Sequence, residues 1–226
     1  MIRRRLNLIS IMTTIPGINC KTLSCVREAM EIIKTLPASW VQVDISDGIF
    51  TPARTFNDPK GFKDLCRELR FSNNIEVHLM VKNPENYLSD WLSVGIKRVI
   101  IHTEAVRDEN ELESYKRKCE KNGAELGLAL NPDTTVEEKK NLLKRVSFIQ
   151  ILAVPPGFSG QRELDVGDKV SFLRETFPRV TIEMDGGVNE ETGKISKKKG
   201  ADILVSVSYI LKSKSPQNAY QTLRAI

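Results

Sequence analysis

Short apolar runs that end in a polar or glycine-bearing segment recur along this chain of 226 residues. The plainest endings lie in residues 41–48, 76–80, 155–161 and 183–188. A β-branched run that ends in a carboxylate, an imidazole or a glycine pair is typical of a buried parallel strand with its functional residue at the carboxyl end. The four endings predict several strands that direct polar groups to one common site.

Eight strand-like runs alternate with segments of helical period. The runs cover residues 6–15, 40–45, 74–81, 97–102, 124–130, 148–154, 180–184 and 203–207. Eight strand-then-helix units without a linker or a change in composition predict a closed (β/α)8 TIM barrel, with one domain over residues 1–226. An open doubly wound sheet has the same periodicity and stays an alternative. A Gly-x-Gly-x-x-Gly segment after the first strand is missing, which weakens the dinucleotide-binding form of that alternative.

The helical segments begin at recognisable capping residues. Such residues accept hydrogen bonds from the free backbone N–H groups of a first turn, and proline fits the first helical position. The predicted starts lie at Asp58-Pro59, Asn83-Pro84, Asp108, Thr134 with Glu137, Asp165, Asn189 and Ser215-Pro216.

Composition narrows the possible partners. The net charge is +5, and no zinc-finger spacing or RNA-binding aromatic motif accompanies it, so we expect no nucleic-acid partner and favour an anionic substrate. No run approaches the ~18 apolar residues of a membrane span, so we expect no membrane partner and a cytoplasmic protein. The four cysteines form no Cys-x-x-Cys pair, and we expect reduced structural thiols rather than disulfides or a metal cluster.

Two carboxylates are candidates for acid–base chemistry. In a barrel, Asp44 and Asp185 would lie at the carboxyl ends of the second and seventh strands. One could remove a proton next to a carbonyl while the other returns a proton to the opposite face. An Asp before Gly, such as Asp185, is also a common turn residue, whereas Asp44 lies inside an apolar run where an idle carboxylate is costly.

His78 lies on the neighbouring strand, level with Asp44. A divalent cation held by Asp44, Asp185 and His78 would stabilise the enediolate that such a proton transfer forms. The alternative for His78 is a hydrogen-bonded core residue, and we assign that structural role to His102.

Glycines and serines follow the last three predicted strands. Barrel enzymes commonly bind phosphate there, through backbone N–H groups. Each glycine taken alone also fits an ordinary tight turn. The segments are Gly157 with Ser159-Gly160, Gly186-Gly187 and Ser206-Val207-Ser208.

These segments, in this order, resemble the ribulose-phosphate 3-epimerase family over nearly the whole chain. The similar stretches are residues 16–19, 42–53, 78–81, 102–105, 127–132, 152–161, 185–188 and 200–202. The most specific are Pro156-Gly157-Phe158-Ser159-Gly160-Gln161 and Asp185-Gly186-Gly187.

The resemblance implies a barrel of the ribulose-phosphate-binding type and a metal-assisted 1,1-proton transfer at C3 of a pentulose 5-phosphate, in the pentose phosphate pathway. It implies Asp44 and Asp185 as acid, base and metal ligands, and His78 as a further ligand. Met80 would line the enediolate, and Gly157, Gly160, Gly186, Gly187 and Ser208 would meet the phosphate. The cofactor would be a divalent cation (zinc, iron, manganese or magnesium), and relatives of this fold suggest a homo-oligomer.

The departures from the family pattern all fall in the site. Gln42 replaces a metal-binding His, and an amide oxygen is a weaker, harder ligand that shifts preference from zinc towards magnesium or manganese. Gly17 replaces a substrate-contacting Ser, and Val207 a Gly near the phosphate. Ser46 and Leu152 replace two methionines, and Ser159 replaces a loop Gly.

Two functions follow from this pattern. One is an active ribulose-phosphate 3-epimerase-like isomerase, supported by Asp44, Asp185 and His78. The alternative is a diverged paralogue that binds a phosphosugar or a protein partner without catalysis, supported by the altered positions. The related phosphosugar decarboxylases use Asp-x-Lys-x-x-Asp, whereas Asp44 here is followed by Ile45-Ser46-Asp47, without the lysine.

Overall fold

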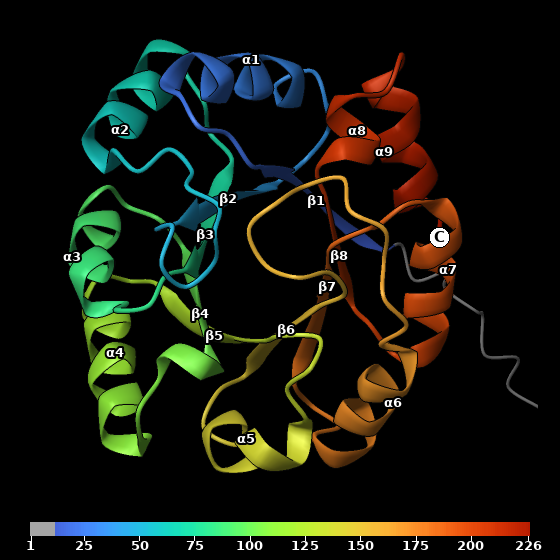
Figure 1. Ribbon diagram of the computed structural model, residues 1–226. Coiled ribbons are helices and arrows are strands. Elements are labelled where there is room, and N and C mark those ends of the chain that lie inside the picture. The colour runs from blue at the N-terminus through green and yellow to red at the C-terminus, as the bar shows by residue number, and fades with distance from the viewer. Residues whose placement is uncertain (1–11) are drawn as a thin grey trace, which may run out of the picture.

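Eight parallel strands close into a barrel, β1 to β8 in chain order, with helices around the outside (Figure 1). The computed structural model describes residues 12–226. The strands are β1 (Thr13–Ile18), β2 (Trp40–Ser46), β3 (Asn74–Met80), β4 (Arg98–His102), β5 (Glu125–Leu130), β6 (Phe148–Leu152), β7 (Thr181–Asp185) and β8 (Ile203–Ser206). The predicted closed barrel is confirmed, and the open doubly wound sheet is wrong.

The helices follow the strands one by one around the ring. They are α1 (Leu23–Ile33), α2 (Pro59–Glu68), α3 (Glu85–Ser93), the short 3-10 helix η1 (Thr103–Ala105), α4 (Glu109–Lys121), α5 (Val136–Leu143), α6 (Gly167–Thr176), α7 (Glu190–Lys199), α8 (Ser208–Leu211) and α9 (Pro216–Arg224). Within residues 12–226, no helix has the length and apolar character needed to cross a membrane.

The first strand differs most from its predicted position. Residues 6–11 of the predicted run lie outside the described residues, and β1 continues three residues further, through Pro16 and Gly17 to Ile18. Proline and glycine both argue against a strand interior in a sequence pattern. Here β1 pairs with β8 from Thr13 to Pro16, and it pairs with β2 only at Gly17 and Ile18.

Most capping predictions hold to within one residue. Asp58, Asp108 and Asn189 each accept a backbone hydrogen bond at the start of α2, α4 and α7. The start of α5 is one residue later than predicted, because Thr135 and Glu138, rather than Thr134 and Glu137, form the capping box. The cap of α3 is likewise Pro84 instead of Asn83.

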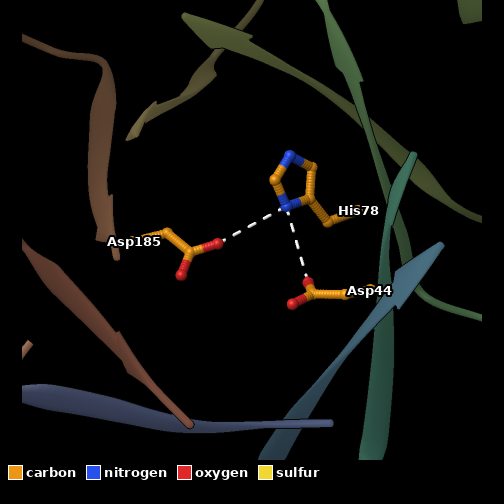
Figure 2. Close-up of side chains that lie close together, drawn as sticks. All are labelled: Asp44, His78 and Asp185. Atoms are coloured by element: carbon orange, nitrogen blue, oxygen red, sulfur yellow. Dashed lines mark ion pairs between the residues drawn. The ribbon is translucent and has the colours of Figure 1, made fainter. Parts of the chain in front are cut away.

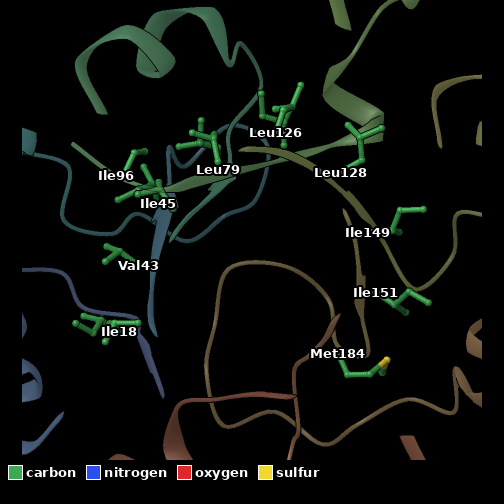
Figure 3. Close-up of a cluster of buried hydrophobic side chains, with 14 of the residues drawn as sticks. Ile18, Val43, Ile45, Leu79, Ile96, Leu126, Leu128, Ile149, Ile151 and Met184 are labelled. Carbon is green, nitrogen blue, oxygen red and sulfur yellow. The ribbon is translucent and has the colours of Figure 1, made fainter. Parts of the chain in front are cut away.

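Alternate residues of the strands divide between two cores. Outward-facing side chains such as Val43, Ile45 and Leu79 pack under the helices, as the ring of green sticks in Figure 3 shows. A smaller apolar cluster fills the inside of the barrel and comprises Ile15, Ile100, Ala129, Phe148, Ile203 and Val205.

The amino-terminal end of the barrel interior also holds a charged group. Arg98 donates to Glu76 at 2.6 Å, and its guanidinium lies 3.7 Å from the ring centre of Phe148. Glu76 and Glu183 are both fully buried beside this arginine. The polar column that begins here continues upward to the carboxyl ends of the strands.

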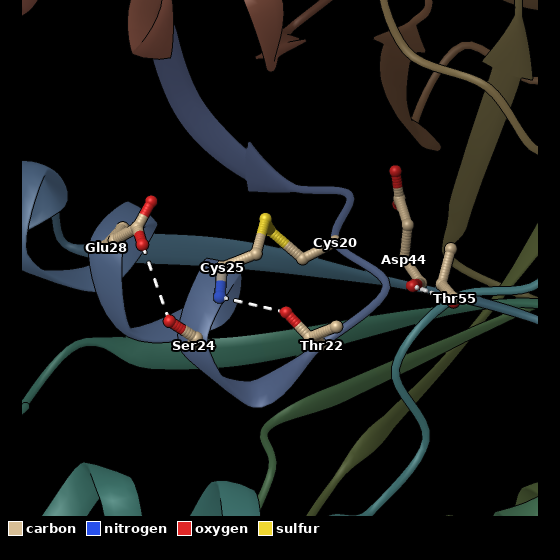
Figure 4. Close-up of a disulfide and its surroundings, with 7 residues drawn as sticks. All are labelled: Cys20, Thr22, Ser24, Cys25, Glu28, Asp44 and Thr55. Carbon is tan, nitrogen blue, oxygen red and sulfur yellow. Dashed lines mark hydrogen bonds between the residues drawn. A yellow bond between two sulfur atoms is a disulfide. The ribbon is translucent and has the colours of Figure 1, made fainter.

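A disulfide joins Cys20 to Cys25 (Figure 4), which corrects the expectation that all the cysteines are reduced. Cys20 follows β1, and the Thr22 side chain caps α1 by accepting from the backbone N–H of Cys25. This tight turn brings the two Cα atoms to 5.6 Å, a separation that a disulfide spans. Cys66 and Cys119 are free, and burial raises the pKa of their thiols to about 11 and about 12, which makes both unreactive.

Candidate active site

Asp44, His78 and Asp185 converge at the carboxyl end of the barrel (Figure 2). Strand register places Asp44 of β2 directly beside His78 of β3, and Asp185 is the last residue of β7. The Nδ1 atom of His78 lies 3.5 Å from Asp44 Oδ1 and 3.4 Å from Asp185 Oδ2. Three side chains from strands far apart in the sequence therefore form one buried cluster.

The two carboxylates determine the charge of His78. Burial alone lowers the pKa of the imidazole, but the interactions with Asp185 and Asp44 outweigh it and raise the pKa to about 9. Burial raises the pKa of Asp185, and the nearby Asp44 charge adds to that, while His78 and Gln42 act in the opposite direction. The cluster is therefore suited to holding a proton or a cation between its carboxylates.

His102, which the sequence assigns a structural role, lies directly behind His78. Their Nε2 atoms are 2.8 Å apart, so one nitrogen donates and the other accepts. Burial lowers the pKa of His102 to about 4, which keeps it neutral. Its Nδ1 lies 3.3 Å from the Glu104 carboxylate, which favours the proton on Nδ1 and leaves Nε2 to accept from His78.

Gln42 joins the cluster through the nitrogen of its amide. Its Nε2 donates to Asp44 Oδ1 at 2.8 Å and to Asp185 Oδ2 at 2.9 Å. The Oε1 atom, which would be the metal ligand, accepts instead from Gln150 at 2.8 Å. Gln42 is thus where the sequence places it, but it presents a donor to the two carboxylates.

One cavity collects the other predicted site residues. Its walls include Asp44, His78, Met80, Gly157, Gly160, Asp185, Gly186, Gly187 and Ser208. The cavity volume is only about 40 Å³, enough for a few water molecules. The gold loop between β6 and α6, which carries Gly157 and Gly160, crosses the middle of the barrel end in Figure 1.

Two of the departures from the family pattern complement each other. A Cβ atom on Gly17 would lie 2.6 Å from a methyl group of Val207, closer than two such atoms can approach. Val207 therefore occupies the space that a side chain at position 17 would need. Gly17 of β1 and Val207, the residue after β8, therefore pack directly against each other.

Two polar residues at the site escaped the sequence analysis. Asn19 lines the cavity and donates to Asp44 Oδ2 at 3.0 Å. Gln150 contacts Gln42 from β6. Asn19 lies in residues 16–19, one of the stretches that resemble the family, and its place after the first strand was the available signal. Gln150 gave a signal too, as a polar residue inside the apolar run 148–152.

The chain matches the model of the ribulose-phosphate 3-epimerase family over residues 14–211. It belongs to the ribulose-phosphate 3-epimerase family. The ribulose-phosphate 3-epimerase of Chlamydia muridarum is 31% identical over 209 residues, which are 88% of each chain. The cytoplasmic isoform of the enzyme from Oryza sativa subsp. japonica is 32% identical over 197 residues, covering 84% of this chain and 82% of the relative. This chain is an epimerase-like enzyme of that family.

Solved structures with the same fold are more distant in sequence. 3-Hexulose-6-phosphate synthase from Salmonella typhimurium superposes with a TM-score of 0.73 at 14% identity, covering 94% of this chain and 97% of that one. KGPDC from Streptococcus mutans, in complex with D-R5P, gives a TM-score of 0.69 at 12% identity, covering 93% and 94%. At these identities the likeness shows the barrel fold alone.

Ribulose-phosphate 3-epimerases are metal-dependent, and the residues present here fit a divalent cation. Asp44, His78 and Asp185 offer two carboxylates and an imidazole whose ligand atoms all lie within 4.8 Å of one another. His78 Nδ1 is buried without a hydrogen-bond partner and faces both carboxylates. Carboxylate and imidazole ligands suit zinc, iron and manganese alike, so the donor set does not select one metal.

Proposed function

We propose that this chain transfers a proton at C3 of a pentulose 5-phosphate, with Asp44 and Asp185 as the acid–base pair. One observation carries the proposal: two buried carboxylates, from β2 and β7, meet at a single imidazole in the wall of the cavity. A pair of this kind can act on the two faces of a flat intermediate, which inverts the stereocentre.

Asp44 and Asp185 would share the roles of acid and base. Each carboxylate would act as the base in one direction of the reaction and as the acid in the reverse direction.

Asp44, His78 and Asp185 would hold the divalent cation, which supplies electrostatic stabilisation of the negative charge that develops on the substrate oxygens. His102 fixes the orientation of His78 by accepting from its Nε2–H. Asn19 donates to the outer oxygen of Asp44 and limits the rotation of that carboxylate.

The phosphate would lie in the same cavity, against Gly157, Gly160, Gly186, Gly187 and Ser208. Gly160 (φ 79°) and Gly187 (φ 67°) have a left-handed backbone, a conformation found in the turns whose backbone N–H groups bind anions. KGPDC, the structural neighbour in complex with D-R5P, supports a phosphosugar in a barrel of this shape.

A second candidate function is binding of a phosphosugar without catalysis. The observation in its favour is the Gln42 amide, which bonds to both carboxylates and so holds them together without a cation. A protein of this kind would bind the sugar phosphate and leave its C3 configuration unchanged.

Conversion of D-ribulose 5-phosphate to its C3 epimer in the presence of Mn²⁺ tests the proposal. Asp44→Asn and Asp185→Asn should each lower kcat by about 10²–10⁴-fold, the usual contribution of a positioned acid or base. Asp58→Asn, at the exposed cap of α2, is the matched control and should keep wild-type activity. Substrate binding without epimer formation by the wild type would favour the second candidate.

A further inference from the structure

Two buried glutamines lie under the carboxylates of the active site. Gln42 of β2 and Gln150 of β6 are both fully buried inside the barrel. The Nε2 of Gln150 donates to Gln42 Oε1 at 2.8 Å and to Glu183 Oε1 at 3.0 Å, and lies 3.3 Å from Asp185 Oδ2. A hydrogen-bonded column thus runs from Glu183 through both amides to Asp44 and Asp185.

The hydrogen bonds permit only one orientation of the Gln42 amide while the carboxylates are ionised. A carboxylate can only accept, so the amide nitrogen must face Asp44 and Asp185. Turning the amide over would place its oxygen against these two acceptors and its nitrogen against the Gln150 nitrogen. Both new contacts would be repulsive in a buried site.

Gln150 in turn is held by Glu183. Turning the Gln150 amide over would set its oxygen against Gln42 Oε1, to which its nitrogen now donates. The pair therefore cannot rearrange one amide at a time.

This arrangement bears directly on cation binding. The oxygens that Gln42 bonds to, Asp44 Oδ1 and Asp185 Oδ2, are the same ones that His78 Nδ1 approaches. The Gln42 amide nitrogen therefore already links these two carboxylate oxygens through hydrogen bonds. The Oε1 atom of Gln42, its only possible metal ligand, points away from them. A cation must compete with these hydrogen bonds for the same two oxygens, and it gains no fourth ligand from Gln42.

We propose that Gln150 is a positioning residue that holds Gln42 as a hydrogen-bond donor between Asp44 and Asp185. In this position Gln42 keeps the two carboxylates together when no divalent cation is bound, and it lowers the affinity of the site for such a cation. The proposal rests on the proposed function in that it takes the cation to bind at Asp44, His78 and Asp185.

Calorimetric titration with Mn²⁺ of the wild type and of Gln150→Met tests this. Methionine keeps the volume and removes the donor, which frees the Gln42 amide to turn its oxygen to the cation. The dissociation constant should fall about tenfold, in line with the effect of residues that orient metal ligands. In excess EDTA the melting temperature of Gln150→Met should fall relative to the wild type, and Mn²⁺ should restore most of the difference. Gln150→Leu is made in parallel in case methionine disrupts folding.

A double-mutant cycle shows whether Gln150 acts through Gln42. In Gln42→Met the added Gln150→Met change should alter the dissociation constant less than twofold, because no amide is left to position. The inference would be overturned if the dissociation constant for Mn²⁺ were unchanged in Gln150→Met. It would also be overturned if Gln150→Met changed that constant as much in the Gln42→Met background as in the wild type. Either result would leave the proposed function intact. If the wild type binds no Mn²⁺ but Gln150→Met does, the inference is supported. If neither binds, the cation site of the proposed function fails together with the inference.

Discussion

At the scale of single residues, the chemistry depends on how each side chain is held. His78 lies between two carboxylates on one side and a neutral His102 on the other. Asp44 is contacted by His78, Gln42 and Asn19 at once. Each group at the centre thus has its orientation fixed by a neighbour outside it, which is how a metal ligand is usually supported.

Cation binding should release a proton from His78. The folded-state pKa of about 9 is above the ordinary 6.5, so the proton stabilises the cation-free fold fully below pH 6.5, and this contribution is lost as the pH rises through about 9. A cation at Nδ1 must displace that proton, so affinity should rise about tenfold per pH unit below pH 9. Calorimetry at pH 7.5 in buffers of different ionisation enthalpy should give about one proton released per ion. Zero protons released would contradict this account of His78.

Removal of the acceptor behind His78 should weaken the cation site. His102→Leu leaves the Nε2–H of His78 buried without a partner, and cation affinity should fall about 10–100-fold. His102→Gln keeps an acceptor oxygen and should retain most of the affinity. Equal losses in the two variants, measured by the same titration, would mean that packing rather than the hydrogen bond matters.

At the scale of elements, the strands bring the site together through their register. Asp44 and His78 meet because they are directly paired neighbours on β2 and β3. Asp185 is paired in the same way with Leu152, at the carboxyl ends of β7 and β6. At the junction of β1 and β8, Val207 fills the space beside Gly17.

That junction gives a prediction about stability. Gly17→Ser places a side chain 2.6 Å from the Val207 methyl group and should lower the free energy of unfolding by about 1–3 kcal/mol, the usual cost of overpacking. Val207→Gly should relieve most of this cost in the double variant. Urea unfolding of all four proteins measures the coupling. Additive effects would show that Gly17 and Val207 are independent.

At the scale of the whole molecule, periodicity and strand endings were enough to predict the barrel and its three central side chains. Each strand of a parallel barrel carries its own signal, and the carboxyl ends always meet on one face. Contacts across the barrel carry no such signal: Gln150 reaches Gln42 only after the sheet closes. The Cys20–Cys25 disulfide escaped prediction because it depends on the turn between β1 and α1 and not on a spacing motif.

The most direct test of the central claim is hydrogen exchange at C3 of the substrate. The protein is incubated with D-ribulose 5-phosphate in D₂O with Mn²⁺, Zn²⁺, Fe²⁺ or Mg²⁺, and NMR follows deuterium at C3. We predict one deuterium at C3 with at least one of these cations for the wild type, and none for the Asp44→Asn/Asp185→Asn double variant. Wild-type protein that shows no exchange with any of the four cations would contradict the assignment of Asp44 and Asp185 as an acid–base pair acting on this substrate.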